Sequence, residues 1–336
     1  MDGDVLQIAG WALPPEQHAE QARFLWNGTH FAKQEYPIVR PDLGAFFAQR
    51  RGAEMSGYVC SALGGGPDHW FDEGCLHLRF EFDEQGLHHP FQHDYFYPDN
   101  RRYPPLPESD RIYRVMGANS ILQFLLGGYS DFNKIKRLVK ATTGDDVENG
   151  KRVLDWGVGC GRVGRYFSAT PGIEFFGVDV DADNVDWCRR HLPGRYAEIP
   201  LHPPIPMEGG SFDLIYGISV LTHLRETDQL AWLAELHRIA APGAIVLLTF
   251  HGTTAANYSG LPFRELDRLL DRVERKGFVL TGGNDQLRDF IGEANYYANV
   301  FHSKDYVRRI WGEHFEVIDI VPGMIATHDL AVLRKR

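Results

Sequence analysis

The spacing of hydrophobic positions changes along the chain, and in its first part it is the spacing of β-structure. From Leu76 to Phe82 every second residue is apolar, which is the pattern of a half-buried strand. Ala22–Trp26 is followed by Asn27-Gly28, a strong signal for a two-residue hairpin turn. Short strands separated by turns, without a long helical period, predict a small all-β sandwich domain over residues 1–98.

The segment after this domain has a different pattern. Pro98–Pro107 is rich in proline and predicts a stiff linker. Ile112–Leu126 and Asp131–Ala141 carry helical spacing, and Gly127-Gly128 between them is expected to break the helix. Residues 99–149 are therefore predicted to be a linker followed by a helical cap.

From Lys151 onward, apolar runs alternate with helical segments. The runs are "RVLDWG", "EFFGVDV", "FDLIYG" and "AIVLLTF". This alternation predicts an α/β domain in which helices cover both faces of a parallel sheet. Phe315–Val321 and Asp329–Leu333 are two further strand patterns joined by a short loop, so they predict an antiparallel hairpin at the end of the sheet.

A glycine-rich turn follows the first of these strands, in the stretch "VLDWGVGCGRVG". Gly159–Gly164 fits the G-x-G-x-x-G pattern of dinucleotide binders, whereas Asp155–Gly161 fits the acidic-x-G-x-G-x-G turn of S-adenosylmethionine (SAM) binders. In either case the glycines let backbone N–H groups approach a ligand. A carboxylate at Asp155 would repel a dinucleotide's pyrophosphate but attract the ammonium and sulfonium groups of SAM. The residues therefore favour SAM over NAD.

The second half of the chain resembles a known family. The resemblance to class I SAM-dependent methyltransferases rests on Asp155–Gly161, Gly177–Asp179, Ser211–Gly217, Ser219–Leu224 and Pro242–Leu248, which occur in the family's order and spacing. It implies a Rossmann-like, seven-stranded methyltransferase sheet with a terminal antiparallel hairpin over residues 150–336. It also implies SAM as the cofactor, with S-adenosyl-L-homocysteine as the product.

The resemblance further implies which residues hold the cofactor. The methionine part would lie on the turn formed by Asp155, Gly157, Gly159 and Gly161. Asp179 would accept hydrogen bonds from the ribose, and Val180 would lie along the adenine.

The helical cap adds two candidate cofactor-binding residues, because many relatives cover SAM with a helix before the first strand. Arg114 is expected to pair with the methionine carboxylate. Tyr129 is expected to pack near the sulfonium, since an electron-rich ring favours a cation.

The acceptor of the methyl group is expected beyond the ends of the fourth and fifth strands. Residues 253–302 form a long insert there, and its polar and aromatic residues Tyr258, Asp285, Tyr296, Tyr297 and His302 suit a polyhydroxylated ligand. Transfer to a hydroxyl needs a general base. His251 is the first candidate, His302 the second and His223 the third, although a satisfied buried histidine is a common alternative for each.

The composition excludes some classes of function. The 336 residues carry a formal net charge of -10, which argues against nucleic acid and anionic membranes as partners. No apolar run reaches the ~20 residues of a membrane span, and the first residues lack the pattern of a signal peptide. We expect a cytoplasmic protein, and a homo-oligomer remains open.

No metal site is expected. His88, His89 and His93 could bind a divalent ion, but their surroundings in the sequence are those of a solvated loop. The end of the fourth strand lacks the clustered carboxylates that a metal-dependent methyltransferase needs.

The N-terminal part suggests the kind of acceptor. Gly10-Trp11, Asn27-Gly28 and Arg40-Pro41-Asp42 resemble a β-sandwich module that accompanies methyltransferase and glycosyltransferase domains in bacterial surface-glycan enzymes. Trp11, Trp26 and Trp70 are expected in the core of this domain rather than on a sugar-stacking face.

The leading hypothesis is therefore a SAM-dependent O-methyltransferase acting on a sugar or glycan hydroxyl. The alternatives are methylation of a phenol or amine of a small natural product, and a non-catalytic glycan-binding or scaffold protein.

Overall fold

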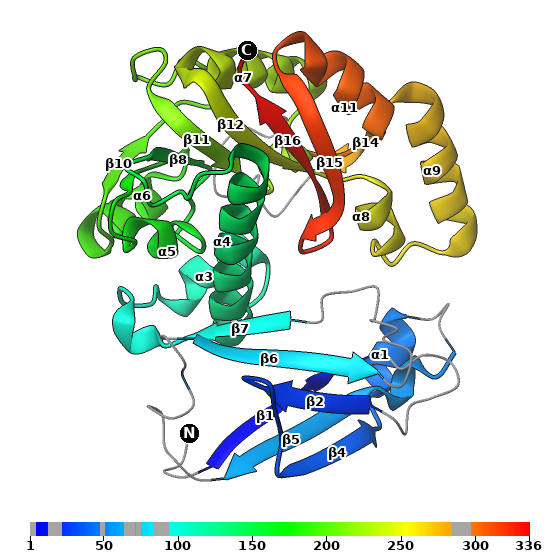
Figure 1. Cartoon of the computed structure of the whole chain (residues 1–336). Helices are drawn as coiled ribbons and strands as arrows, with labels where there is room; N and C mark the ends of the chain where they lie inside the picture. Colours follow the sequence, from blue (N-terminus) through cyan, green and yellow to red (C-terminus); the bar gives the residue numbers. More distant parts are fainter. Residues whose placement is uncertain are drawn as a thin grey trace. The chain divides into compact units, whose positions relative to one another are not determined.

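The structure is a computed structural model that describes residues 5–12, 22–47, 51–63, 71, 75–82, 94–283 and 297–336. The chain divides into two compact units, Met1–Arg102 and Tyr103–Arg336, so the boundary falls within the predicted linker. Figure 1 shows the elements of both units.

The first unit contains two small antiparallel sheets. One has the strand order β1-β5-β4 and the other the order β3-β2-β6-β7. The strands are β1 (Val5–Trp11), β2 (Ala22–Trp26), β3 (Thr29–His30), β4 (Lys33–Ile38), β5 (Gly57–Leu63), β6 (Cys75–Phe82) and β7 (Asp94–Pro98). The predicted hairpin turn is confirmed, because Asn27 and Gly28 join β2 to β3 with φ values of 45° and 77°.

The core of this unit draws on both sheets. Phe24, Tyr58 and Leu76 belong to one buried hydrophobic cluster. Only strands were predicted in this unit, but it also contains a short helix, α1 (Pro41–Phe46). The helix begins with proline, whose fixed φ suits the first helical turn. Trp11 also departs from its predicted core position, since it is 39% exposed. Trp70 lies outside the described residues.

The second unit is built on a seven-stranded mixed sheet of the Rossmann-like methyltransferase type. Its order is β10-β9-β8-β11-β12-β16-β15. The strands are β8 (Arg152–Trp156), β9 (Glu174–Asp179), β10 (Arg195–Glu198), β11 (Phe212–Gly217), β12 (Ala240–Phe250), β15 (Glu316–Ile325) and β16 (His328–Arg334). Strand β16 is antiparallel to both β12 and β15, so the predicted terminal hairpin is confirmed.

Helices surround this sheet. They are α3 (Ser109–Met116), α4 (Ile121–Thr143), α5 (Gly164–Ser168), α6 (Ala182–His191), α7 (Glu226–Ile239), α8 (Thr253–Asn257), α9 (Phe263–Lys276) and α11 (Lys304–Ile310), with the 3-10 turns η4 (Leu221–His223) and η5 (Trp311–Glu313). No helix in the described part of the chain combines the length and apolarity that a membrane span requires.

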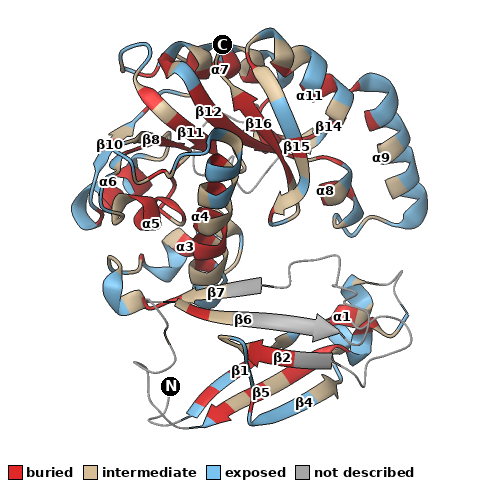
Figure 2. Cartoon of the chain, viewed as in Figure 1, coloured by how far each residue is buried: buried red, intermediate tan, exposed pale blue. Residues whose placement is uncertain are grey.

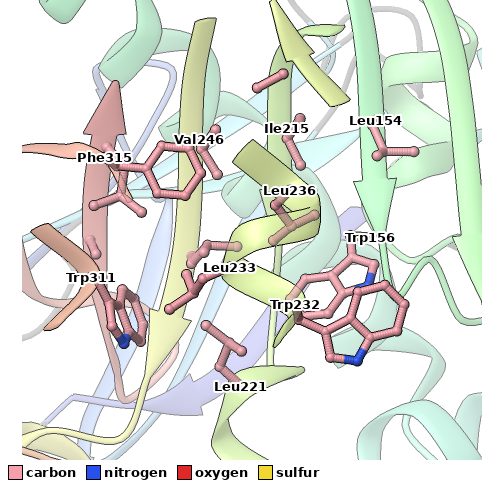
Figure 3. Packing of buried hydrophobic residues seen from close by; sticks show 14 of the residues in the cluster. Leu154, Trp156, Ile215, Leu221, Trp232, Leu233, Leu236, Val246, Trp311 and Phe315 are labelled. Atoms are coloured by element: carbon pink, nitrogen blue, oxygen red, sulfur yellow. The ribbon is translucent and has the colours of Figure 1, made fainter. Parts of the chain in front are cut away.

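The main core lies between the sheet and helix α7. Trp156 of β8 packs against Trp232 of α7, with ring centroids 5.2 Å apart, and Leu233 and Leu236 continue the contact with the central strands (Figure 3). The central strands are buried, whereas α9 exposes one side to solvent (Figure 2). Burial on both faces explains why these strands are continuous apolar runs in the sequence.

Helix α4 corrects one prediction. It runs without interruption through Gly127 and Gly128, which were expected to break it. An added Cβ at Gly128 would lie only 2.2 Å from the carbonyl oxygen of Arg162, in the turn after β8. The absence of a side chain therefore serves the close approach of the helix to that turn rather than a helix end.

The predicted acceptor insert, residues 253–302, contains α8, α9 and a separate two-stranded sheet. The strands of that sheet, β13 (Phe278–Gly283) and β14 (Ala298–His302), are antiparallel. Asp285 and Tyr296, which were expected to contribute to the acceptor pocket, lie outside the described residues.

Candidate active site

A cavity of about 200 Å³ lies in the second unit beside the ends of β8, β9 and β11. The carboxyl ends of parallel strands are where open α/β sheets bind ligands. Its lining residues are Arg114, Val115, Trp156, Gly157, Gly159, Asp179, Val180, Asp181, Asn184, Ile199, Ile218, Ser219, Val220, His223, Leu224, Trp232 and Tyr297.

Two of the predicted glycines, Gly157 and Gly159, line this cavity with φ values of 84° and 51°. L-residues rarely adopt these angles, and a Cβ at Gly157 would lie 2.4 Å from Val220. Gly161 also has a positive φ, 79°, but is not a lining residue; its added Cβ would meet Leu192 at 2.4 Å. Gly161 thus allows the turn to pack against the residue that follows α6, whereas Gly157 and Gly159 line the cavity next to the side chains of Val220 and Val115.

Asp179 ends β9 and lines the cavity, as predicted. Its Oδ2 accepts a 2.7 Å hydrogen bond from the N–H of Gly159, and its Oδ1 accepts a 2.9 Å bond from the N–H of Asp181. Burial raises the pKa of this carboxyl, and the two backbone hydrogen bonds oppose that shift. Each oxygen keeps a lone pair, so the carboxylate can hold the glycine turn and still accept hydrogen bonds from a diol.

Asp155 occupies a different position from the one expected. Its side chain is 4% exposed and is not among the lining residues. Tyr216 of β11 donates a 2.9 Å hydrogen bond to its Oδ2. Burial raises the pKa of Asp155 to about 7, while the bond from Tyr216 lowers it. The buried carboxyl therefore links β8 to β11 through its hydrogen bond with Tyr216 rather than facing the cavity.

The two predicted cap residues lie in different places. Arg114 of α3 lines the cavity, and its Nη1 lies 3.1 Å from Oδ2 of Asp181. Tyr129 of α4 packs instead in an aromatic cluster, with its ring centroid 5.0 Å from that of Tyr166 and 5.9 Å from that of Phe132. Val180 also lines the cavity.

Of the three candidate bases, only His223 lines the cavity. Its ring is hydrogen-bonded to the side chain of Asn299 and to the backbone of Ala298, both in β14. Burial lowers its pKa to about 4, against the opposing effect of these bonds. The imidazole is therefore neutral at physiological pH.

His251 lies next to His223, with ring centroids 6.1 Å apart, but is not a lining residue of the cavity. Its Nδ1 lies 3.1 Å from the carbonyl oxygen of Val300, which can only accept, so Nδ1 carries the hydrogen. Burial, followed by the nearby His223, lowers its pKa to about 4. His251 is thus a neutral, fixed ring next to the cavity wall rather than part of it.

His328 was missed by the sequence reasoning. Its ring centroid lies 4.7 Å from that of His251, and its Nδ1 lies 3.2 Å from the hydroxyl of Ser219. Burial lowers its pKa to about 3. The antiparallel pairing of β16 with β12 brings this residue next to Ser219, so no local motif could have indicated it.

His302 lies in the core, away from the lining residues, and is 1% exposed. Its Nε2 lies 2.9 Å from Oε1 of Gln229, and the rings of Phe250, Phe278 and Trp311 surround it. Burial lowers its pKa to about 3. His302 therefore occupies a structural position in the core, with Nε2 paired to Gln229 and Nδ1 buried without a hydrogen-bond partner among the described residues.

Metal ligands are not clustered in the described part of the chain. There, no group of three or more His, Cys, Asp or Glu side chains is arranged to hold an ion. His88, His89 and His93 lie outside the described residues.

Part of the chain matches known proteins in sequence. Residues 153–243 match the family described as "Methyltransferase domain". Sterol methyltransferase-like 3 of Botryococcus braunii is 28% identical over 121 residues, which are 34% of this chain and 30% of that protein. The chain thus spans less than a third of the length of this relative.

Two solved structures are similar at low sequence identity. Magnesium protoporphyrin IX methyltransferase from Synechocystis PCC 6803, with bound S-adenosylhomocysteine, is 16% identical with a TM-score of 0.45; the match covers 68% of this chain and 94% of that one. A SAM-dependent methyltransferase from Methanosarcina mazei is 15% identical with a TM-score of 0.41, covering 56% and 93%.

The cofactor of the site is S-adenosyl-L-methionine. The domain match covers β8, the glycine turn and β9, which are the elements that line the cavity with Gly157, Gly159 and Asp179. These residues fit the cofactor, since Gly157 and Gly159 line the cavity with backbone alone and the carboxylate of Asp179 can receive a ribose.

Proposed function

We propose that the protein transfers a methyl group from SAM to a neutral hydroxyl of a sugar or glycan. The observation that carries the proposal is that one cavity is lined both by the cofactor-binding residues and by the neutral imidazole of His223. Bound SAM supplies a methyl group on a sulfonium, and the departing sulfur becomes the neutral thioether of S-adenosylhomocysteine.

The residues of the chain act on the cofactor and on the acceptor proton. Gly157 and Gly159 would admit the methionine part and Asp179 would receive the ribose, while Arg114, whose Nη1 lies 3.1 Å from Oδ2 of Asp181, lines the same cavity. Because the reacting hydroxyl loses a proton as it is methylated, a ring nitrogen of His223 accepts that proton. Trp156 and Trp232 exclude water from the apolar side of the cavity.

The charges around the cavity favour a neutral acceptor over an amine. The described carboxylates of its lining are Asp179 and Asp181, and both are engaged with the cofactor side of the site. Away from them, the polar lining residues are Ser219, His223 and Tyr297. A cationic amine would find no counter-charge among these described residues, whereas a hydroxyl finds hydrogen-bonding partners.

We also propose that the first unit is the β-sandwich module of a bacterial surface-glycan enzyme. The support is the resemblance at Gly10-Trp11, Asn27-Gly28 and Arg40-Pro41-Asp42, together with the single hydrophobic cluster shared by its two sheets.

The test is methyl transfer from labelled SAM to a panel of methyl pyranosides, phenols and primary amines. We expect label in base-stable ethers of the pyranosides. His223→Ala should lower turnover by about 10²- to 10⁴-fold while SAM affinity, measured by calorimetry, stays within about twofold. His191→Ala, on the exposed end of α6, is the matched control. Label only in phenols or amines would contradict the sugar acceptor, and full activity of His223→Ala would remove it as the base.

A further inference from the structure

Ser219 follows β11 and lines the cavity with an uncommon backbone conformation. Its φ is 61°, in the left-handed region that residues other than glycine rarely adopt. Its N–H donates a 2.7 Å hydrogen bond to Oγ1 of Thr249, and its carbonyl accepts a 2.8 Å bond from Oγ1 of Thr222. A strained residue that is held in this way by its surroundings is a typical feature of a binding or catalytic site.

The hydroxyl of Ser219 is held as well. Its Oγ lies 3.2 Å from Nδ1 of His328, and the ring of His328 packs against that of His251. A serine hydroxyl has one donor and two acceptor positions, so the bond to His328 leaves capacity for another partner in the cavity. His328 is not a lining residue, but it orients the hydroxyl of Ser219, which is one.

Ser219 and His223 stand at the two ends of the short turn that contains η4. The hydrogen bond from Thr222 to the Ser219 carbonyl and the 3.1 Å bond from the His223 N–H to the Val220 carbonyl close this turn. Two neutral polar side chains, four residues apart on one turn, therefore line the same cavity.

We propose that Ser219 is a specificity residue that hydrogen-bonds a second hydroxyl of the acceptor, adjacent to the hydroxyl that His223 deprotonates. The acceptor class is then a vicinal diol of the kind found in pyranosides, and His328 is the positioning residue for Ser219. This inference rests on the proposed function and deepens it, because it requires a second, neighbouring hydroxyl, which a simple alcohol lacks.

The experiment compares methyl pyranosides of glucose, galactose and mannose with their monodeoxy analogues in which the neighbouring hydroxyl is missing. We expect the full-length protein to prefer the intact diol by about tenfold or more in kcat/KM, because a site built to bind a hydroxyl rejects its absence. In Ser219→Gly this preference should fall to about one, mainly through KM. Glycine tolerates the backbone angle, so the variant removes the hydroxyl without added strain.

Two further variants separate positioning from packing. His328→Phe should lose the preference in the same way, and His328→Asn should restore part of it, because the amide can reach Ser219. Ser211→Gly is the matched control, since its hydroxyl bonds the carbonyl of Glu208 on a surface turn. SAM affinity measured by calorimetry should be unchanged in all of them, which verifies folding.

The outcomes distinguish the two proposals. An unchanged diol preference in both Ser219→Gly and His328→Phe would overturn the role of Ser219 and leave hydroxyl methylation intact. A wild-type protein that methylates the deoxy analogues as well as the diols would overturn the diol as the acceptor class. Absence of transfer to every pyranoside, with SAM bound, would overturn both proposals.

Discussion

Gln229 accepts a hydrogen bond from His302, with 2.9 Å between Oε1 of the amide and Nε2 of the imidazole. The amide nitrogen of Gln229 donates to the carbonyls of Leu221 and Leu224, at 2.7 and 3.0 Å. Because the nitrogen faces two acceptors, the oxygen must face the donor, so Nε2 of His302 carries the hydrogen. A buried histidine of β14 thus supports, through Gln229, the turn that carries His223.

Gln229→Met should destabilise the protein by about 2–4 kcal/mol, because it leaves two buried carbonyls and one ring nitrogen without partners. Urea unfolding followed by circular dichroism measures the change. Gln123→Met is the control, because Gln123 is exposed on the first turn of α4. Equal stability of the two variants would mean that the Gln229 hydrogen bonds do not support this turn.

The two adjacent glycines of α4 should respond oppositely to alanine. At Gly128 the added Cβ would lie 2.2 Å from the Arg162 carbonyl oxygen, which is backbone and cannot yield, so Gly128→Ala should cost several kcal/mol. At Gly127 the nearest atom, at 3.3 Å, is Nη1 of the Arg162 side chain, which also pairs with Asp131 and needs to shift by only a few tenths of an ångström, so Gly127→Ala should gain up to about 1 kcal/mol from helix propensity. Thermal unfolding measures the stability of both variants. Similar unfolding midpoints for Gly127→Ala and Gly128→Ala would refute the close approach of α4 to the turn.

Asp179→Asn should weaken SAM binding by about ten- to a hundredfold, because an amide provides one acceptor oxygen where the carboxylate provides two for the backbone and the ribose. Calorimetry measures the dissociation constant. Asp186→Asn on the exposed face of α6 is the control, since its partners there are the surface arginines Arg189 and Arg190. Unchanged SAM affinity in Asp179→Asn would remove this residue from the cofactor site.

His302 should make the fold sensitive to acid. Burial lowers its pKa from 6.5, the ordinary value of a solvated histidine, to about 3 in the folded chain, so the unfolded chain binds the extra proton as the pH falls below 6.5. Folding stability should therefore drop by about 2 kcal/mol between pH 7 and pH 5 from this group alone. His302→Gln keeps a donor toward Gln229 but does not titrate, so its stability should depend less on pH by that amount. Identical pH dependence in the two proteins would count against a buried neutral His302.

The parts of the site that depend on neighbours in the sequence could be predicted. The glycine turn, Asp179 and the terminal hairpin are local patterns, and each is found in the expected element. The predicted ranking of the histidines did not anticipate their places, because only His223 of the three lies on the cavity wall. Which side of a strand end a histidine faces depends on tertiary packing, and no spacing in the sequence records it.

Asp155 and Gly127-Gly128 illustrate the same limit. An acidic residue before a glycine turn can face the ligand or the interior, and the choice at Asp155 is made by Tyr216, which lies on a neighbouring strand. Adjacent glycines usually weaken a helix, but in α4 they permit contact with Arg162. Both outcomes depend on partners that are distant in the sequence.

The position of β16 has a consequence for synthesis on the ribosome. This strand is the last of the sheet in chain order, yet it lies between β12 and β15 in space. The nascent chain can complete β8 to β12 and the cofactor turn early, but Ser219 has no His328 to hold it until residues 328–334 have emerged and inserted between their two neighbours. A partly made chain can therefore acquire the elements of the cofactor site before it acquires the side of the cavity that we propose selects the acceptor.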